Sequence, residues 1–315
     1  MYPLTIHLIV VAIGAIGVLG HPGAAGAATA VRFWEEALPG TPMPEVIADL
    51  VQKGIDHSPL VEHYPVTDSG AVNDGQKNYR CGGRCPAENV MSFFFRKTEV
   101  RVGNTMTFSF PRHRVSPFLP RDVADGIPFG DPASVLATFH VAPSSAEATI
   151  VRDTLSQCQA LPVVPEQKAC ATSLEGTVES AKHMLGNGVL WAAASALPST
   201  PTTAGLPLQS YVIQAVTTLD GDRHVGCHVM PYPYAVYYCH MTGLPTKAYM
   251  VSLRSSSGGG PAVTLAALCH LDTSNWSPAH PAFKTLHTQP GGEPICHFMS
   301  YANLLFGEKA VAGNP

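Results

Sequence analysis

Four Cys-His dipeptides lie in the C-terminal third of the chain, separated by 10, 28 and 25 residues. In a β-strand, neighbouring side chains point to opposite faces, so a dipeptide on a strand offers sulfur to one face and imidazole to the other. The cysteines could therefore form covalent bridges while the histidines gather around a metal ion or a reacting group. The four dipeptides are Cys227-His228, Cys239-His240, Cys269-His270 and Cys296-His297.

The composition limits the fold and the partners. With 315 residues, of which 45% are hydrophobic, the chain can build one large domain with appendages. Charged residues make up 13% and the formal net charge is -4, so there is no basic field of the kind that nucleic-acid binding requires. The 28 glycines and 28 prolines favour turns. We expect an α+β fold: a predominantly antiparallel β domain with a few packed helices, stapled by disulfides.

The N-terminus has the pattern of an export signal. Leu4 to Leu19 is apolar except for two positions, and small residues follow from Gly23 to Ala30. We interpret residues 1–28 as a signal peptide removed in the mature protein. A retained membrane anchor is the alternative, because no charged residue precedes Arg32. The mature protein is expected to be secreted, with no membrane association after cleavage.

Eight cysteines in an oxidising compartment predict four disulfides, although 105 pairings are conceivable. Ser144 and Glu147 resemble a capping box ahead of a helix that ends near Cys158, and a second helical spacing runs from Cys170 to a stop at Gly186. Prolines separate the two segments, so we predict a helical hairpin that pairs Cys158 with Cys170.

The remaining cysteines form two groups. Cys81 and Cys85 enclose the turn-forming segment 82–84 and are predicted to bridge each other, with pairing to a distant cysteine as the alternative. The four dipeptide cysteines are then left to form two bridges among themselves. These are Cys227, Cys239, Cys269 and Cys296.

Several segments predict regular structure. Pro44 opens a short helix that Gly54 is expected to end, and residues 56–84 are predicted to be a linker. Short β-branched or aromatic runs predict strands, and two of them are expected to form a hairpin turned at residues 103–104. The predicted strands are Tyr211–Val216, Tyr234–His240, Ala248–Leu253 and Val263–Cys269, and the predicted hairpin joins Phe93–Arg101 to Thr105–Phe110.

The histidines of the dipeptides are candidate metal ligands. If the sulfurs are oxidised, a Cys₂His₂ zinc site loses half its ligands, whereas a histidine cluster in an oxidising setting favours Cu(II). Ligation requires neutral rings, so binding is expected to weaken as the pH falls toward 5. The alternative is that His228, His240, His270 and His297 donate hydrogen bonds inside a sheet and brace the disulfides. Weaker candidates for an outer role are His224, Asp272 and His280.

The dipeptides and their surroundings resemble the BURP domain, a plant-specific module of secreted proteins. The resemblance rests on the stretch from Cys227 to His240, on Cys269–Ser274 with Trp276, and on Cys296-His297-Phe298. It extends upstream to Cys170–Glu175 and Phe33-Trp34. The middle gap looks slightly long, with residues 258–260 as the insertion, and the tail near residues 304–307 lacks the usual tryptophan. It implies a BURP domain at 91–308, after an N-terminal segment and linker at 29–90 and before a tail at 309–315.

Two classes of function follow from the resemblance. Many members are secreted structural or regulatory proteins of the plant cell wall that act in development or stress. For this chain the resemblance implies such a role, with wall polysaccharide or wall protein as partner. Others are copper-dependent cyclases that link Trp or Tyr side chains within a peptide, with the histidines of the dipeptides as ligands. The resemblance thus implies copper at His228, His240, His270 and His297. This chain shows no repeated core motif, so as an enzyme it would act on a separate peptide.

Overall fold

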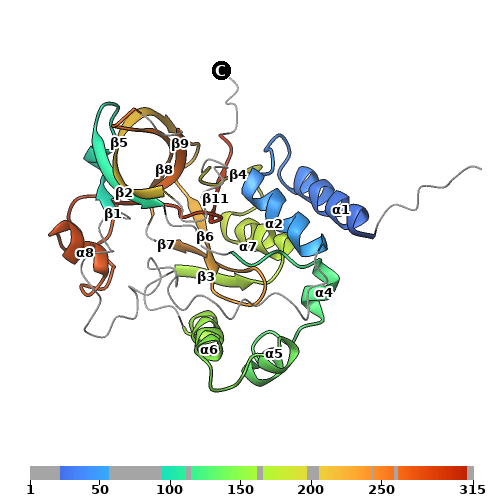
Figure 1. Ribbon diagram of the computed structural model, residues 1–315. Coiled ribbons are helices and arrows are strands. Elements are labelled where there is room, and N and C mark those ends of the chain that lie inside the picture. Colours follow the sequence, from blue (N-terminus) through green and yellow to red (C-terminus); the bar gives the residue numbers. More distant parts are fainter. Residues whose placement is uncertain are drawn as a thin grey trace, which may run out of the picture.

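A computed structural model describes residues 22–56, 94–110, 115–161, 166–196, 206–242, 244–258 and 262–310. Within these ranges the chain forms two antiparallel β-sheets and a set of helices (Figure 1). The predicted α+β fold with disulfide staples is confirmed. Most of the predicted signal peptide, and the predicted linker with Cys81 and Cys85, lie outside the described residues.

The larger sheet, sheet A, has the strand order β1-β10-β9-β8-β5-β2. Its strands curl around an apolar core of their own, to which Phe95, Tyr211 and Leu265 belong (Figure 1). Alternate side chains of each strand supply this core, because they share one face. Three of the predicted strands are confirmed here, as β5, β8 and β9. The bounds are β1 Phe94–Arg96, β2 Thr105–Phe110, β5 Leu206–Thr218, β8 Thr246–Ser255, β9 Val263–His270 and β10 Ile295–Phe298.

The smaller sheet, sheet B, has the order β3-β7-β6-β11-β4. The predicted strand Tyr234–His240 corresponds to β7. Sheet B packs against the outer face of sheet A, where Trp191 and Leu305 meet Ala248 and Leu268. The two sheets therefore share a seam. The bounds are β3 Glu166–Ala171, β4 Leu190–Ala193, β6 His224–Met230, β7 Val236–Thr242 and β11 Leu304–Glu308.

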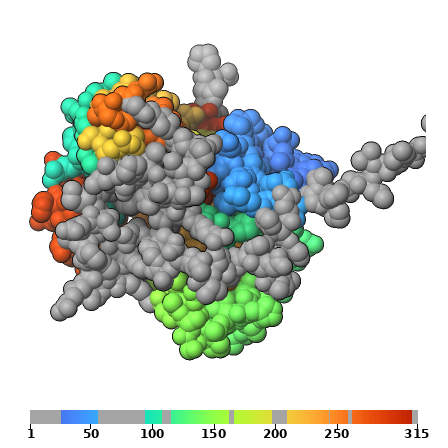
Figure 2. All heavy atoms as spheres, in the orientation of Figure 1, coloured from blue at the N-terminus to red at the C-terminus, as the bar shows by residue number. Residues whose placement is uncertain are grey.

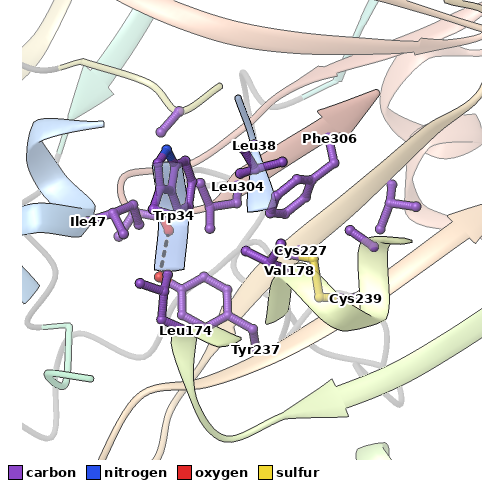
Figure 3. Packing of buried hydrophobic residues seen from close by; sticks show 14 of the residues in the cluster. Trp34, Leu38, Ile47, Leu174, Val178, Cys227, Tyr237, Cys239, Leu304 and Phe306 are labelled. Atoms are coloured by element: carbon purple, nitrogen blue, oxygen red, sulfur yellow. Dashed lines mark hydrogen bonds between the residues drawn. A yellow bond between two sulfur atoms is a disulfide. The ribbon is translucent and has the colours of Figure 1, made fainter. Parts of the chain in front are cut away.

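Helices cover the other face of sheet B. The helices α1 (Pro22–Ala37), α2 (Glu45–Asp56) and α7 (Leu174–Leu185) lie together on it (Figure 1). Their apolar residues form one core with the sheet, in which Trp34 is 1% exposed (Figure 3). Trp34 also donates from Nε1 to the Thr41 carbonyl at 2.9 Å. The N-terminal segment is thus part of the folded body.

A second helical group lies beside sheet B. It comprises α4 (Arg121–Asp125), α5 (Pro132–Thr138) and α6 (Ala146–Gln159), of which α5 and α6 protrude at the lower edge of the molecule (Figure 2). The short helix α8 (Pro281–Leu286) packs near β1 of sheet A, and a 3₁₀ turn spans Lys97–Glu99. The helices therefore lie on more than one side of the two sheets. No helix among the described residues is long and apolar enough to cross a membrane.

Three disulfides join cysteines in the described part of the chain. Cys158 pairs with Cys170, as predicted, and the dipeptide cysteines form two bridges among themselves, also as predicted. The predicted helical hairpin is wrong, however, because Cys170 lies on strand β3 and the second helix begins at Leu174. The helix before it is capped by Ser145, not by Ser144. The dipeptide bridges are Cys227–Cys239 and Cys269–Cys296.

The predicted hairpin of Phe93–Arg101 with Thr105–Phe110 is also wrong. Strand β1 pairs with β10 and strand β2 pairs with β5, so the two segments join different neighbours in sheet A. The turn at Gly103 is real, with a φ of 89°, but the chain before it forms a 3₁₀ turn instead of a long strand. In the observed arrangement Phe95 of β1 is buried in the core of sheet A, and this burial of an apolar side chain stabilises the pairing with β10.

Gly54 has a different role from the one its sequence position indicates. Helix α2 continues past it to Asp56, so it does not end the helix. A Cβ at this position would overlap the carbonyl oxygen of Phe118, whose amide donates to the Leu50 carbonyl at 3.1 Å. Glycine is required here because another part of the backbone approaches closely.

We expect the double substitution Cys158→Ser/Cys170→Ser to lower the free energy of unfolding by about 3 kcal/mol, the chain-entropy value for a loop of this size. The bridge ties α6 to the edge strand β3, where Cys170 is opposite Tyr238 of β7. Urea unfolding of the oxidised proteins measures the change. A double variant as stable as the parent would contradict this role.

Candidate metal centre

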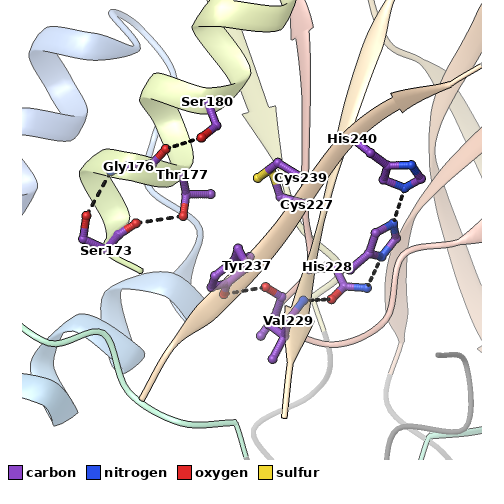
Figure 4. The surroundings of a disulfide bond; sticks show 12 residues. Ser173, Gly176, Thr177, Ser180, Cys227, His228, Val229, Tyr237, Cys239 and His240 are labelled. Atoms are coloured by element: carbon purple, nitrogen blue, oxygen red, sulfur yellow. Dashed lines mark hydrogen bonds between the residues drawn. A yellow bond between two sulfur atoms is a disulfide. The ribbon is translucent and has the colours of Figure 1, made fainter. Parts of the chain in front are cut away.

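The four dipeptide histidines meet at the seam between the two sheets. Cys227 and Cys239 point from sheet B into the core under α7, so the neighbouring His228 and His240 emerge on the opposite face (Figure 4). Cys269 and Cys296 point into the core of sheet A, so His270 and His297 emerge from its outer face, toward sheet B. Strand alternation thus turns four dipeptides into one cluster of imidazoles.

The strand register fixes this placement. Cys227 is directly opposite Cys239, and Cys269 is directly opposite Cys296. On the other face of sheet B, His240 is opposite Gly226, and a Cβ at Gly226 would lie 3.3 Å from His228 Nε2. The absence of a side chain at Gly226 leaves room for the His228 ring to lie toward His240.

The histidines approach one another as two pairs. The Nε2 atoms of His228 and His240 are 3.1 Å apart, and those of His270 and His297 are 3.4 Å apart. The pairs adjoin, because the ring centroids of His228 and His297 are separated by 6.1 Å. Two nitrogens bound to one ion at about 2.0 Å, with a bond angle between 90° and 110°, lie roughly 2.8 to 3.3 Å apart. The spacing within each pair is therefore close to that of two ligands on one metal ion.

The donor set also suits copper. The cysteine sulfurs beside the cluster are oxidised, so the available ligands are imidazoles and not thiolates. In the part of the chain that the structure describes, no three His, Cys, Asp or Glu side chains converge closely enough to hold an ion. Binding through more than one pair therefore requires the rings to move closer together.

Two polar side chains that sequence reasoning missed contact the pair in sheet B. Glu166 on β3 accepts from His240 Nδ1 through Oε2 at 3.2 Å, and the Tyr238 hydroxyl donates to its Oε1 at 3.0 Å. Asn303 precedes β11 and lies 3.1 Å from His228 Nδ1 through Nδ2. No motif distinguishes Glu166 or Asn303 in the sequence, and only the sheet pairing brings them to the cluster.

Burial controls the charge of the cluster. It lowers the pKa of His228 and of His270 well below the ordinary value, and neighbouring histidines lower both further. Burial likewise lowers the pKa of His297 to about 4. The rings of these three histidines are therefore neutral at pH 7, as ligation requires. Protons compete with a metal ion at lower pH than the ordinary histidine pKa implies, which revises the expected pH range.

The carboxyl of Glu166 remains ionised beside these rings. Burial acts to raise the pKa of Glu166, but the hydrogen bonds from His240 and from the Tyr238 hydroxyl and the charge of Lys168 outweigh it. The net effect holds the pKa of Glu166 below its ordinary value. An ionised carboxylate can only accept hydrogen bonds, so His240 must donate from Nδ1.

The other sequence candidates lie outside the cluster or beside it. His224 is buried, but it bonds the Thr246 hydroxyl at 2.7 Å and packs on a tryptophan in β4. Asp272 caps a turn by accepting from the Ser274 amide at 2.8 Å. His280 caps α8 and packs against Trp276, which in turn contacts His270 at a centroid distance of 4.9 Å.

A groove of about 1000 Å³ runs along the edge strand β3. Its walls come from β3, α7 and the segment after α6, and its lining includes Arg121, Lys168, Ser173 and Glu179. Glu166 also lines it, and the carboxylate of the same residue accepts from His240, so the groove reaches a residue that contacts the histidine cluster. This is the connection between the cluster and a surface recess.

Comparison with known proteins places these features in a family context. The family model of the BURP domain matches residues 93–308. The chain is 43% identical over 259 residues to BURP domain-containing protein 13 of Oryza sativa subsp. japonica, covering 80% of this chain and 61% of that protein. It is 42% identical over 252 residues to Protein RAFTIN 1A of Triticum aestivum, covering 78% and 62%. With BURP domain-containing protein 5 of the same rice it is 34% identical over 275 residues, covering 85% and 83%. The matched region thus spans about three fifths of the first two relatives.

We predict that the metal-free protein loses stability as the pH falls from 6.5 to 5. The lowered pKa values mean that the unfolded chain binds protons in this range that the folded chain does not, and each such histidine contributes about 1.4 kcal/mol per pH unit. The histidines concerned are His228, His270 and His297. Urea unfolding in the presence of a chelator measures how the free energy of unfolding changes with pH. The pH range lies above the ordinary pKa values of carboxyl groups, so their titration contributes little.

The variant His297→Gln provides the control. Its neutral amide cannot take up the proton, so the slope should decrease by about 1.4 kcal/mol per pH unit. A pH-independent stability in the parent, or an unchanged slope in the variant, would show that these histidines are not buried in a neutral state.

Proposed function

This chain belongs to the BURP domain family, and from that membership and the histidine cluster we propose that it is a secreted plant cell-wall protein that binds copper. The observation that carries the proposal is the meeting of four imidazoles from both sheets at one seam. Its partner outside the cell is proposed to be a wall polysaccharide or a wall protein, in a developmental or stress-related role.

Two properties of the chain support secretion. All cysteines in the described ranges are paired, and structural disulfides persist in oxidising compartments. The apolar N-terminal stretch, followed by small residues, has the pattern of a signal peptide. Together they favour the apoplast over the reducing interior of the cell.

Copper is preferred over zinc for chemical reasons. The cluster offers neutral imidazole and an adjoining carboxylate, without thiolate, and Cu(II) stands above zinc in affinity for such nitrogen ligands. The residues that would hold the ion are His228, His240, His270 and His297, in one site or in two. Glu166 would orient His240 from its other ring nitrogen, as outer carboxylates commonly do for metal-binding histidines.

A second candidate function is oxidative peptide cyclisation, and the groove along β3 favours it. Glu166 lines the groove and its carboxylate contacts His240, so a peptide bound at that end of the groove would lie next to a residue that contacts the cluster. In such a reaction an aromatic side chain and a backbone atom each lose one hydrogen and form a bond. The two electrons and two protons pass to dioxygen, for which bound copper supplies the redox chemistry.

The copper site is tested by metal analysis of the purified, folded protein. We expect the double variant His228→Ala/His270→Ala to lose most of its copper, because each substitution removes a ligand from one pair. The variant His183→Ala, which changes an exposed histidine on α7, should retain the parent copper content. Full copper occupancy in the folded double variant would return these histidines to a structural role.

The cyclase candidate is tested separately, with synthetic peptides that contain Trp or Tyr. If it is correct, copper-loaded protein in the presence of dioxygen converts a peptide to a product lighter by two hydrogen atoms, as mass spectrometry detects. The His228→Ala/His270→Ala variant should give none of this product. Copper binding without any such product over a peptide panel would favour the non-catalytic role.

A further inference from the structure

A chain of hydrogen bonds runs through the histidine pair of sheet B, and a backbone amide fixes its direction. The amide N–H of Val229 can only donate, and it donates to Asn303 Oδ1 at 3.0 Å. The amino group of Asn303, Nδ2, must therefore face His228 Nδ1, 3.1 Å away. Because that amino group can only donate, His228 Nδ1 accepts and carries no proton.

The same logic determines the next two groups. A neutral imidazole carries one proton, so His228 carries it on Nε2 and donates to His240 Nε2 at 3.1 Å. His240 then carries its proton on Nδ1 and donates to the Glu166 carboxylate. The donors and acceptors of this series of hydrogen bonds are therefore compatible with one arrangement of protons only, from Val229 to Glu166.

In the pair of sheet A, the hydrogen bonds do not fix the tautomers of both rings in this way. His297 Nδ1 lies 3.4 Å from the Phe298 carbonyl, which can only accept, so His297 presents an Nε2 lone pair to His270. His270 Nδ1 lies 3.5 Å from the hydroxyl of Thr242, which can donate or accept. His270 can therefore adopt the tautomer in which both Nε2 lone pairs face a common ion.

We propose that Asn303 is a positioning residue that holds His228 in the Nε2–H tautomer and thereby weakens metal binding by the pair in sheet B. The inference rests on the proposed copper site. A metal ion can bind His228 Nε2 only if that nitrogen loses its proton or the Asn303 amide rotates. Rotation would place the Asn303 amino group against the Val229 N–H, two donors facing each other. The cluster thus contains one pair ready for an ion and one pair that Asn303 restrains.

The tautomer is measured directly, without copper. Long-range ¹H–¹⁵N correlation spectra of the metal-free full chain, labelled with ¹⁵N-histidine and assigned with the variant His228→Gln, distinguish a protonated nitrogen from one with a lone pair. We expect His228 to carry its proton on Nε2 in the parent. In Asn303→Asp the carboxylate accepts from both Val229 and His228, so the proton should move to Nδ1.

Copper titration tests the consequence. With its lone pair freed, the pair in sheet B of Asn303→Asp should bind copper about 10- to 100-fold more tightly than in the parent, the range that outer partners of metal ligands typically control. Asn187→Asp is the matched control, because it adds the same charge at an exposed position after α7. Its affinity for copper should equal that of the parent.

The outcomes separate the inference from the proposed function. A parent His228 protonated on Nδ1 overturns the tautomer assignment, whatever the copper result. The expected tautomers with equal copper affinity in the parent and Asn303→Asp overturn the tuning role alone. The expected tautomers with no copper binding by either protein support the assignment and overturn both the tuning role and the copper site.

Discussion

The alternation of side chains along a strand is the constraint on which the rest of this structure depends. Each dipeptide bridge joins two cysteines that are directly opposite in the ladder, so the register of both strand pairs is set at that point. A slip of one residue would turn every side chain to the wrong face. Since a histidine follows each cysteine, fixing the sulfur in an apolar core also fixes an imidazole on the opposite face.

That constraint has an electrostatic consequence at the seam. Imidazoles leave water when the two sheets pack together, and burial disfavours their charged form. The apolar contacts of Leu268 and Leu305 beside the cluster exclude water from the same seam. Glu166 and Asn303 supply hydrogen bonds that the buried rings of sheet B would otherwise lack. The seam can therefore hold these polar rings, because their nitrogens have hydrogen-bond partners there.

Structural features that depend on residues near in sequence could be predicted, and features that depend on distant parts of the backbone could not. Regular spacing predicted the helix after Ser173 and most of the long strands. The cysteine pattern predicted the Cys158–Cys170 bridge and two bridges among the dipeptide cysteines, but not which of these cysteines pair. The same reasoning placed Cys170 on a helix, because it lies four residues before Leu174, a spacing that fits a helix. Cys170 instead lies on the strand that precedes the helix. Gly54 read as a helix end because nothing in the sequence reveals that Phe118 approaches it.

The partners of the histidines belong to this second class, and the third disulfide explains how one of them reaches the cluster. Glu166 lies on β3, an edge strand with one partner in its sheet. The bridge from Cys158 to Cys170 anchors the far end of that strand to α6, and Lys168 adds a bond to the Gln157 carbonyl at 3.1 Å. An edge strand held in this way keeps its carboxylate against His240. All three described bridges thus position groups of one site, two through the ligands themselves and one through the carboxylate that orients a ligand.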